Sequence, residues 1–291
     1  MHTLFYDKII GFIGAGNMAE AMIHALLYGC GHPSSQILSS DPSPEKRERM
    51  AKLFQIFSTE DNMEVFQKAD ILILSVKPQQ MKSVLGTLTS NPDFKNIRGK
   101  KLIISIAAGI PLSFLTKNLK EKTPSCAMDH LTLVRVMPNT PSLAGEGMAG
   151  ISPEKTASQE DIEISLALME TMGKAVLVPE SLMDSLTALS GSGPAYVFLF
   201  AEAMIQAGVE LGMDAETASM LTRQTMKGAV ALLEKGDEDA ASLRKKVTSP
   251  GGTTAAALSV FMEGGFSELV LNALAAAKKR SEELAEEIEK L

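Results

Sequence analysis

The feature that most constrains the fold is a short apolar run that leads straight into a glycine-rich turn near the start of the chain. Ile9–Ile13 is followed by Gly14-Ala15-Gly16-Asn17-Met18-Ala19, a G-x-G-x-x-A pattern at the start of a helix-like segment. In this pattern the first glycine permits a tight turn, the second lets the backbone approach a diphosphate, and the alanine lets the helix pack closely on the strand. The N–H groups at the helix start then face the phosphates. A turn of this kind can also be purely structural, but its place after an apolar strand favours a dinucleotide site that includes Gly14, Ala15, Gly16, Asn17 and Met18.

Short apolar runs alternate with helix-like segments through the first half of the chain. We expect strands over Lys8–Ile13, Gln36–Ser39, Ile71–Val76, Leu102–Ile106, Leu133–Met137, Met148–Ile151 and Ala175–Val178. Helical patterns lie between them over Met18–Leu27, Glu45–Phe54, Pro78–Leu88 and Glu160–Met172. This alternation is typical of an α/β fold in which a mostly parallel sheet is covered by helices on both faces. Residues 1–179 are therefore predicted to form a doubly wound domain.

After Pro179 the strand-like runs end, and the chain continues as helices separated by glycines. We place the domain boundary there and expect an all-helical domain over residues 180–291. Asp214 is a suitable N-cap for a helix over Ala215–Leu233, and a further long helix is expected from Phe266 to the end. Ala195–Leu211 is apolar almost all round, which predicts burial on every side. A core shared between subunits explains this pattern, and a central place in a monomeric bundle is the alternative.

Charge, cysteine content and hydropathy argue against several classes of protein. The net charge is −7 and the pI is near 5.3, which argues against binding to a nucleic-acid backbone. The two cysteines, Cys30 and Cys126, and the four scattered histidines form neither a disulfide framework nor a metal-binding cluster. The apolar stretch Pro194–Gly208 contains Glu202 and is shorter than the ~20 residues that span a bilayer. We expect a cytoplasmic protein with no metal and with neither a membrane nor a nucleic acid as its partner.

The choice of nucleotide depends on the end of the second expected strand, at Ser40-Asp41. An acid at this place commonly binds the ribose 2′-hydroxyl of NAD and repels a 2′-phosphate. Ser40, Ser43, Lys46 and Arg47 stand close by and could hold that phosphate. Asp41 can also be a turn or N-cap residue before a proline. NADH and NADPH therefore both stay candidates.

Two other loops follow expected strands, where ligands of open α/β sheets collect. One contains Val76, Lys77 and Pro78, where the proline makes a rigid turn. The other, Ser105–Gly109, consists mainly of small residues such as Ala107 and leaves room for a ring.

A hydroxyl-rich loop, Thr248-Ser249-Pro250-Gly251-Gly252-Thr253-Thr254, leads into an alanine-rich helical segment. Its backbone N–H groups at a helix start can hold a carboxylate, and a hydroxyl can then meet a neighbouring polar atom. An ordinary loop with hydroxyl N-caps is the alternative. The glycines of Ser190–Tyr196 are more typical of close helix packing than of a binding site.

Together these motifs resemble one family, the pyrroline-5-carboxylate reductases, which catalyse the last step of proline biosynthesis. The likeness covers nearly the whole chain. It includes Gly11–Gly16, Val76–Gln79, Ser105–Gly109, Met137–Pro141, Ser190–Tyr196, Ser249–Thr254 and the segment from Gly264 to Asn272. The resemblance implies a Rossmann domain followed by an all-helical domain that interlocks in a homodimer. In this family dimers often assemble further, commonly into decamers.

The resemblance also implies roles for particular residues. It places the substrate at Ser249, Gly252, Thr253 and Thr254, with the Thr254 hydroxyl on the ring nitrogen, and Glu180 matches an acidic position near the substrate. Asn62, Val76, Lys77, Pro78 and Ala107 correspond to further cofactor contacts. The position of Asp41 is variable in the family and is serine in some members that use NADPH, so the cofactor preference stays open.

The implied reaction is hydride transfer from NADPH or NADH to a five-membered cyclic imine that bears a carboxylate, giving L-proline. We expect Thr254 to donate, directly or through water, to the imine nitrogen. The nearest rival class, the β-hydroxyacid dehydrogenases, uses a lysine on a helix after the domain junction, and no lysine occurs between Ser181 and Met226. A second rival is a dinucleotide-sensing regulator without catalysis, which would need no hydroxyl-rich loop.

Overall fold

The computed structural model describes residues 2–95, 97, 99–123, 128 and 130–290, and Cys126 lies outside them. The chain divides into two compact units, Met1–Ser192 with Ala277–Leu291, and Gly193–Ala276. This division differs from the boundary expected at residue 179. Glu180–Gly191 and the end of the last helix belong with the first unit because their side chains bond to its sheet and helices.

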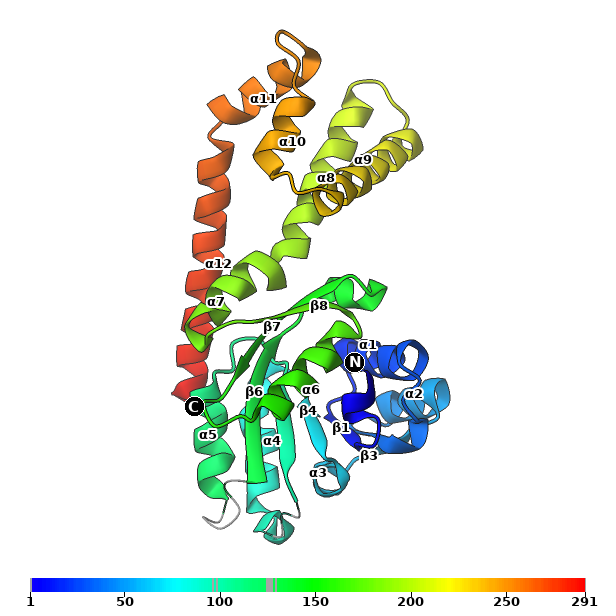
Figure 1. Cartoon of the computed structure of the whole chain (residues 1–291), viewed down its shortest axis with the longest axis vertical. Helices are drawn as coiled ribbons and strands as arrows, with labels where there is room; N and C mark the ends of the chain where they lie inside the picture. The colour runs from blue at the N-terminus through cyan, green and yellow to red at the C-terminus, as the bar shows by residue number, and fades with distance from the viewer. Residues whose placement is uncertain (1, 96, 98, 124–127, 129, 291) are drawn as a thin grey trace. The chain divides into compact units, whose positions relative to one another are not determined.

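The first unit is built on one eight-stranded sheet (Figure 1). The strands are β1 Ile10–Ile13, β2 Ile37–Ser40, β3 Phe57–Thr59, β4 Ile71–Leu74, β5 Lys101–Ser105, β6 Leu131–Met137, β7 Gly147–Pro153 and β8 Gly173–Leu177. Their order is β3-β2-β1-β4-β5-β6-β7-β8. The first six strands are parallel, and β7 pairs antiparallel with β6. The expected mostly parallel, doubly wound sheet is therefore confirmed, and its strand order reverses between β1 and β4.

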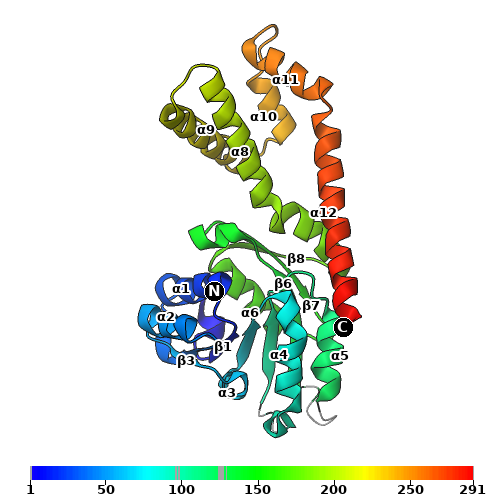
Figure 2. The ribbon, with the colours of Figure 1, turned by 180° about the vertical axis from the view of Figure 1, so that it is seen from behind.

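Helices cover both faces of this sheet. Their bounds are α1 Asn17–His24, α2 Pro44–Phe54, α3 Asn62–Lys68, α4 Pro78–Ser90, α5 Leu112–Asn118, α6 Gln159–Glu170 and α7 Met183–Leu186. Side chains of α1, α2 and α6 form one apolar core, and those of α3, α4 and α5 form the other. Figure 2 shows α4 and α5 from the second side. Burial on both faces explains why the central strands are almost continuous apolar runs.

Three elements of this unit were not expected from the sequence: β3, α3 and α5. β3 has three residues and an exposed Phe57, so it shows no apolar run. α3 and α5 have seven residues each, which is too short for a clear helical period. The N-cap of α3 is Asp61, whose side chain accepts from the Met63 N–H.

The second unit is helical, as expected. It contains α8 Gly193–Glu210, α9 Ala215–Lys235, α10 Ala240–Lys246, α11 Thr253–Glu263 and the first part of α12 Phe266–Glu289. α8 and α9 lie side by side, and Asp214 caps α9 through the Thr217 N–H. The rings of Phe200, Phe261 and Phe266 contact one another and join α8 to α11 and α12.

The apolar helix α8 is not buried within a single chain, which argues against a central place in a monomeric bundle and keeps a core shared between subunits as the prediction. All of its residues are exposed or partly exposed, and Phe198 and Leu199 are 67% and 66% exposed. By length and composition, the described helical run Glu180–Glu210 could cross a membrane, and α11 with α12 passes as a bent pair. That run is longer than the apolar stretch considered in the sequence. An apolar helix that its own chain leaves uncovered is also typical of a subunit interface.

Gly11 on β1 lies where α3 packs closely on the sheet. A Cβ at this position would lie 2.7 Å from Val65 Cγ1 and 2.8 Å from Ala69 Cβ. We expect Gly11→Ala to lower the free energy of unfolding by about 1–3 kcal/mol, as overpacking of a tight core does. Urea unfolding followed by circular dichroism measures the change.

Gly86 provides the matched control, because it lies on α4 where a Cβ would meet no described atom within 4 Å. Gly86→Ala should leave the protein equally stable or more stable by about 0.4–1 kcal/mol. If Gly11→Ala behaved like Gly86→Ala, the close packing of α3 on β1 would be wrong.

Candidate active site

A cleft of about 920 Å³ lies where β1, β2, β4 and β5 end at their carboxyl edge. It is lined by Ile13, Gly14, Gly16, Asn17, Met18, Ser40, Asp41, Pro42, Ser43, Lys46, Glu60, Asn62, Ser75, Val76, Lys77, Pro78, Gln79, Gln80, Ser83, Val84, Thr87, Ile106, Ala107 and Ala108. Open α/β sheets bind ligands at this edge, at the point where the strand order reverses. Every cofactor residue predicted from the sequence lines this cleft except Ala15, whose N–H bonds to a residue that does.

The glycine turn after β1 has the geometry that its sequence predicts. Gly14 adopts φ +101°, and a Cβ there would lie 2.9 Å from the carbonyl carbon and oxygen of Ser75. Gly16 is the N-cap of α1 and has no side-chain cap, and a Cβ on it would meet no described atom within 4 Å. The N–H groups of the first turn of α1 therefore border open space, which fits a diphosphate.

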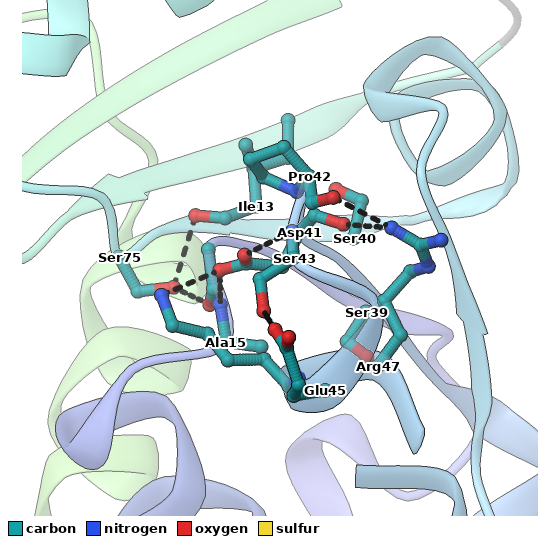
Figure 3. A network of polar contacts seen from close by, with 12 residues as sticks. Ile13, Ala15, Ser39, Ser40, Asp41, Pro42, Ser43, Glu45, Arg47 and Ser75 are labelled. Carbon is teal, nitrogen blue, oxygen red and sulfur yellow. Dashed lines mark hydrogen bonds and ion pairs between the residues drawn. The ribbon is translucent and has the colours of Figure 1, made fainter. Parts of the chain in front are cut away.

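Asp41 joins the turn after β2 to the glycine turn (Figure 3). Its Oδ2 accepts from the Ala15 N–H at 2.9 Å and from Lys46 Nζ at 3.2 Å. Its Oδ1 accepts from the Ser43 N–H at 3.0 Å. The residue is only 5% exposed. This carboxylate is therefore already held by three donors, one of which belongs to the turn that faces the diphosphate.

These contacts determine the charge state of Asp41. Burial raises its pKa, but the hydrogen bonds from Ala15, Ser43 and Lys46 outweigh burial and hold the pKa below the ordinary value. A carboxyl group with a lowered pKa stabilises the fold above its unfolded pKa, and this contribution is lost as the pH falls through the folded pKa. Asp41 is therefore ionised at neutral pH, and Lys46 neutralises it locally.

Cations and hydroxyls surround the same end of the cleft. Arg47 Nη1 donates to the carbonyl oxygens of Asp41 and Pro42, both at 2.9 Å. Ser40 Oγ donates to Asn62 Oδ1 at 2.7 Å, which fixes that amide at the start of α3. α2 begins here because Ser43 caps it through the Lys46 N–H and Pro44 occupies its first turn.

The opposite wall comes from the turns after β4 and β5. Ser75 Oγ donates to the carbonyl oxygens of Ile13 and Gly14, at 3.0 and 2.7 Å, and ties the two turns together. Lys77 is the N-cap of α4, and Pro78 occupies its first position. Ala107 and Ala108 leave space at the β5 end because their side chains are small.

Five residues that no sequence motif indicated also line the cleft: Glu60, Gln80, Ser83, Val84 and Thr87. The last four lie on one face of α4 at helical spacing. Because this helix was expected to start beside the cleft, that spacing could have predicted them as lining residues. Glu60 gave no such signal, because it precedes an element that was itself unexpected.

The hydroxyl-rich loop lies in the second unit, before α11. The Gly252 N–H donates to the Ser249 carbonyl at 3.0 Å, and Gly251 adopts φ +69°. Gly252 is the N-cap of α11 and has no side-chain cap among the described residues. Thr253 and Thr254 occupy the first turn, where N–H groups lack helical partners. The loop therefore brings Ser249, Gly252, Thr253 and Thr254 together at an uncapped helix start, as an anion site requires.

Glu180 lies apart from that loop in sequence and belongs to the first unit. Its Oε1 accepts from Arg135 Nη1 at 2.9 Å and from the Leu112 N–H at 3.1 Å. Its Oε2 is buried and has no hydrogen-bond partner among the described residues. Contact between Glu180 and a substrate stays a prediction.

A Rossmann unit with a nucleotide-sized cleft, followed by a helical unit, is typical of dinucleotide-dependent oxidoreductases. Comparison with known proteins gives the family. Residues 9–109 match the family model described as NADP oxidoreductase, coenzyme F420-dependent. Residues 180–284 match the model described as pyrroline-5-carboxylate reductase dimerisation.

Relatives match almost the whole chain. The chain is 44% identical to pyrroline-5-carboxylate reductase of Pseudomonas aeruginosa, over 96% of this chain and 97% of the relative. The enzyme of Haemophilus influenzae is 43% identical over 95% and 97%. Among solved structures, a pyrroline-5-carboxylate reductase from Coxiella burnetii superimposes with a TM-score of 0.84 at 34% identity, covering 96% and 98% of the two chains. The Plasmodium falciparum pyrroline carboxylate reductase with NADP bound gives 0.82 at 31%, covering 96% and 99%. The chain belongs to the pyrroline-5-carboxylate reductase family.

Asp41 gives a test of the nucleotide site. We expect Asp41→Ala to weaken binding of both NADH and NADPH by about 10-fold or more, because a hydrogen bond to a charged group contributes about 1.5–3 kcal/mol and the Ala15 N–H would lose its acceptor. Isothermal titration calorimetry with each nucleotide measures this. Glu48→Ala, which removes an exposed acid from the neighbouring helix α2, is the control and should change neither affinity. Tighter NADPH binding by Asp41→Ala, with NADH binding alone weakened, would contradict this role and make Asp41 a reader of the ribose.

Proposed function

We propose that this chain reduces 1-pyrroline-5-carboxylate to L-proline with hydride from NADPH or NADH. The observation that carries the proposal is the near full-length similarity to curated pyrroline-5-carboxylate reductases at up to 44% identity. The cleft at the strand ends and the uncapped start of α11 are the two sites that such a reaction requires.

The first step is to hold the substrate carboxylate. N–H groups at the start of α11, with the hydroxyls of Ser249 and Thr253, suit a carboxylate because the helix dipole places partial positive charge there. The last turn of α10 carries Arg244, Lys245 and Lys246 just before this loop. Their charge favours the approach of an anionic substrate to a protein whose net charge is −7.

The second step is the chemistry at the imine. NAD(P)H held in the cleft by the start of α1 would supply the hydride for the imine carbon, with the C=N π electrons going to nitrogen. We assign the Thr254 hydroxyl, directly or through water, to donate a hydrogen bond or proton to that nitrogen. Hydride and this one proton together give the neutral secondary amine, and the proton of Thr254 is replaced from water. Because the nitrogen becomes strongly basic as hydride adds, orientation by the loop matters more than a strong acid.

The nucleotide site supports use of NADPH as well as NADH. Lys46 neutralises the Asp41 carboxylate, and Ser40 and Ser43 line the same end of the cleft. Arg47 donates to the Asp41 and Pro42 carbonyls beside it. A 2′-phosphate there would meet cations as well as an acid. A solved relative from Plasmodium falciparum contains NADP, which agrees with this proposal.

We further propose that the chain works as a homodimer that assembles further, for example into a decamer, in the cytoplasm and without a membrane or nucleic-acid partner. The match of residues 180–284 to a dimerisation model supports oligomerisation. The exposed apolar surface of α8 would be buried by a second subunit, which would stabilise a dimer.

Two rivals make different predictions for turnover. A β-hydroxyacid dehydrogenase would oxidise or reduce hydroxyacids, and a nucleotide sensor would turn over nothing. Oxidation of NADPH and NADH is followed with pyrroline-5-carboxylate, with hydroxyacids and without substrate. Turnover only with the cyclic imine supports the proposal, whereas turnover only with hydroxyacids or none at all overturns it.

Thr254 is tested by two substitutions. We expect Thr254→Ala to lower kcat/KM for the imine by about 10²-fold, the contribution typical of a general acid. Thr254→Val keeps the branched shape and removes the hydroxyl, so it should show the same loss. Steady-state kinetics at saturating NADPH measures both, and a Thr254→Val enzyme with parental kinetics would remove the hydroxyl from the mechanism.

The interface is tested on α8. We expect Phe198→Glu to reduce the mass of the assembly, because a charge buried in an apolar interface lacks a partner. Leu143→Glu, at a residue that is 62% exposed in the first unit, is the matched control and should keep the parental mass. Sedimentation velocity gives the masses, and a Phe198→Glu protein of unchanged mass would place the interface elsewhere.

A further inference from the structure

Arg135 on β6 is a buried guanidinium that the proposed chemistry does not use. Its side chain is 4% exposed. Nη1 donates to Glu180 Oε1 at 2.9 Å, and Nη2 lies 3.7 Å from Asp184 Oδ1. Removing a charge from water is costly unless partners surround it, and here two carboxylates from one short stretch face it. Because an apolar side chain would fill the same space at a lower cost, this buried charge suggests a role other than packing.

The first connection made by this cluster leads to the wall of the nucleotide cleft. Glu180 Oε1 also accepts from the Leu112 N–H, at 3.1 Å. Leu112 begins α5, directly after the turn that contains the lining residues Ala107 and Ala108. One carboxylate oxygen therefore joins the sheet, through Arg135, to the end of the turn that borders the cleft.

The second connection leads to the two stretches of chain that border the helical unit Gly193–Ala276. Asp184 Oδ1 accepts from Ser281 Oγ at 2.7 Å, and Ser281 is 5% exposed. Asp184 precedes the helical unit in sequence and Ser281 follows it. In the same region, a Cβ on Gly109, which adopts φ +70°, would lie 3.5 Å from Leu284 Cβ. The chain that enters the helical unit and the chain that leaves it are thus tied together within the first unit.

We propose that Arg135 is a positioning residue: with Glu180, Asp184 and Ser281 it couples the Ala107–Leu112 turn of the nucleotide cleft to the two stretches that border the helical unit. This rests on the proposed function, because the Ala107–Leu112 turn borders the cleft in which the nicotinamide nucleotide would react. The cluster has little redundancy. Arg135 Nη2 and Glu180 Oε2 are both buried without a hydrogen-bond partner among the described residues, so the loss of one bond is not compensated by another.

A purely structural ion pair in the same unit provides the comparison. Lys120 Nζ donates to Glu154 Oε1 at 2.8 Å, and the two side chains are 12% and 13% exposed. Glu154 Oε1 also accepts from a backbone N–H, that of Leu133, at 3.0 Å. This pair therefore resembles the Arg135–Glu180 pair in its bonds, although the Glu180 side chain is 35% exposed. Among the described residues, neither member lines the cleft or bonds to the Ala107–Leu112 turn.

The experiment compares Arg135→Met with Lys120→Met in the full-length protein. For each we measure kcat, the KM for pyrroline-5-carboxylate, the dissociation constant for NADPH, thermal unfolding, and hydrogen exchange of the amides over residues 106–115. We expect Arg135→Met to lower kcat by about 10–100-fold, because a small misplacement of reacting groups has effects of this size. NADPH affinity should change less than about 3-fold, because the N–H groups at the start of α1 are intact. Exchange at Leu112 should accelerate. Lys120→Met should unfold at a lower temperature but keep its kcat and its exchange over residues 106–115.

Conservative variants keep the test decisive. Arg135→Lys preserves the charge but not the fork that faces two carboxylates, so its kcat should lie between those of the parent and Arg135→Met. If Arg135→Met does not fold, Glu180→Gln, which retains an acceptor for the Leu112 N–H, takes its place and should lower kcat to a smaller extent. Equal kcat in Arg135→Met, Lys120→Met and the parent, with unchanged exchange over residues 106–115, would overturn the proposal.

The test also separates this inference from the proposed function. If the parental protein does not reduce pyrroline-5-carboxylate, the proposed function fails, and hydrogen exchange then decides the inference alone. Faster exchange over residues 106–115 in Arg135→Met but not in Lys120→Met would support the coupling. Equal exchange in the two variants would refute it.

Discussion

The nucleotide cleft depends on one close backbone approach, between the turn after β1 and the turn after β4. Gly14 lies so near the Ser75 carbonyl that no side chain fits, and Ser75 Oγ returns hydrogen bonds to the Ile13 and Gly14 carbonyls. This contact is made where the strand order reverses. It leaves the start of α1 bordering open space, and the other lining residues are added around it from β2, β5 and α4. A larger residue at position 14 would separate the two turns and would also require a backbone conformation that side chains disfavour.

The position of Asp41 in the sequence is compatible with two different roles. Its place after β2 is that of an acid that binds a ribose, and its place before a proline is that of a turn residue. In the structure its carboxylate accepts from the glycine turn, from its own turn and from Lys46. The Asp41 carboxylate therefore stabilises the glycine turn after β1, whether or not it also binds the ribose of the nucleotide. Its identity alone is a weak guide to nucleotide preference, because its charge is already balanced.

The elements predicted correctly from the sequence are those that local residue patterns determine. β1, β2 and β4–β8, the helices α1, α2, α4 and α6, and the lining of the cleft at Gly14–Met18, Val76–Pro78 and Ala107 follow from apolar runs, glycines and prolines whose effects are local. β3, α3 and α5 were not predicted because they are short and are fixed by tertiary packing. The partners of Arg135 could not be predicted either. Residues 135, 180, 184 and 281 are far apart in sequence, and nothing local indicates that a guanidinium on a strand would face carboxylates after the last strand.

The apolar helix α8 links the fold of one chain to the formation of an oligomer. A helix without a polar face is stable in water only if something covers it, and this chain leaves its large side chains exposed. The dimerisation model spans this helix and also the hydroxyl-rich loop before α11. The same unit therefore carries both the surface that needs a second copy and the residues assigned to the substrate, while the cleft is complete within the other unit. The chain passes between these units through the stretches that meet at Asp184 and Ser281, and we propose that a constraint on those stretches affects catalysis as well as stability. On our proposal, the buried charge of Arg135, although costly for folding, is retained because it joins these stretches to the turn that ends at Leu112.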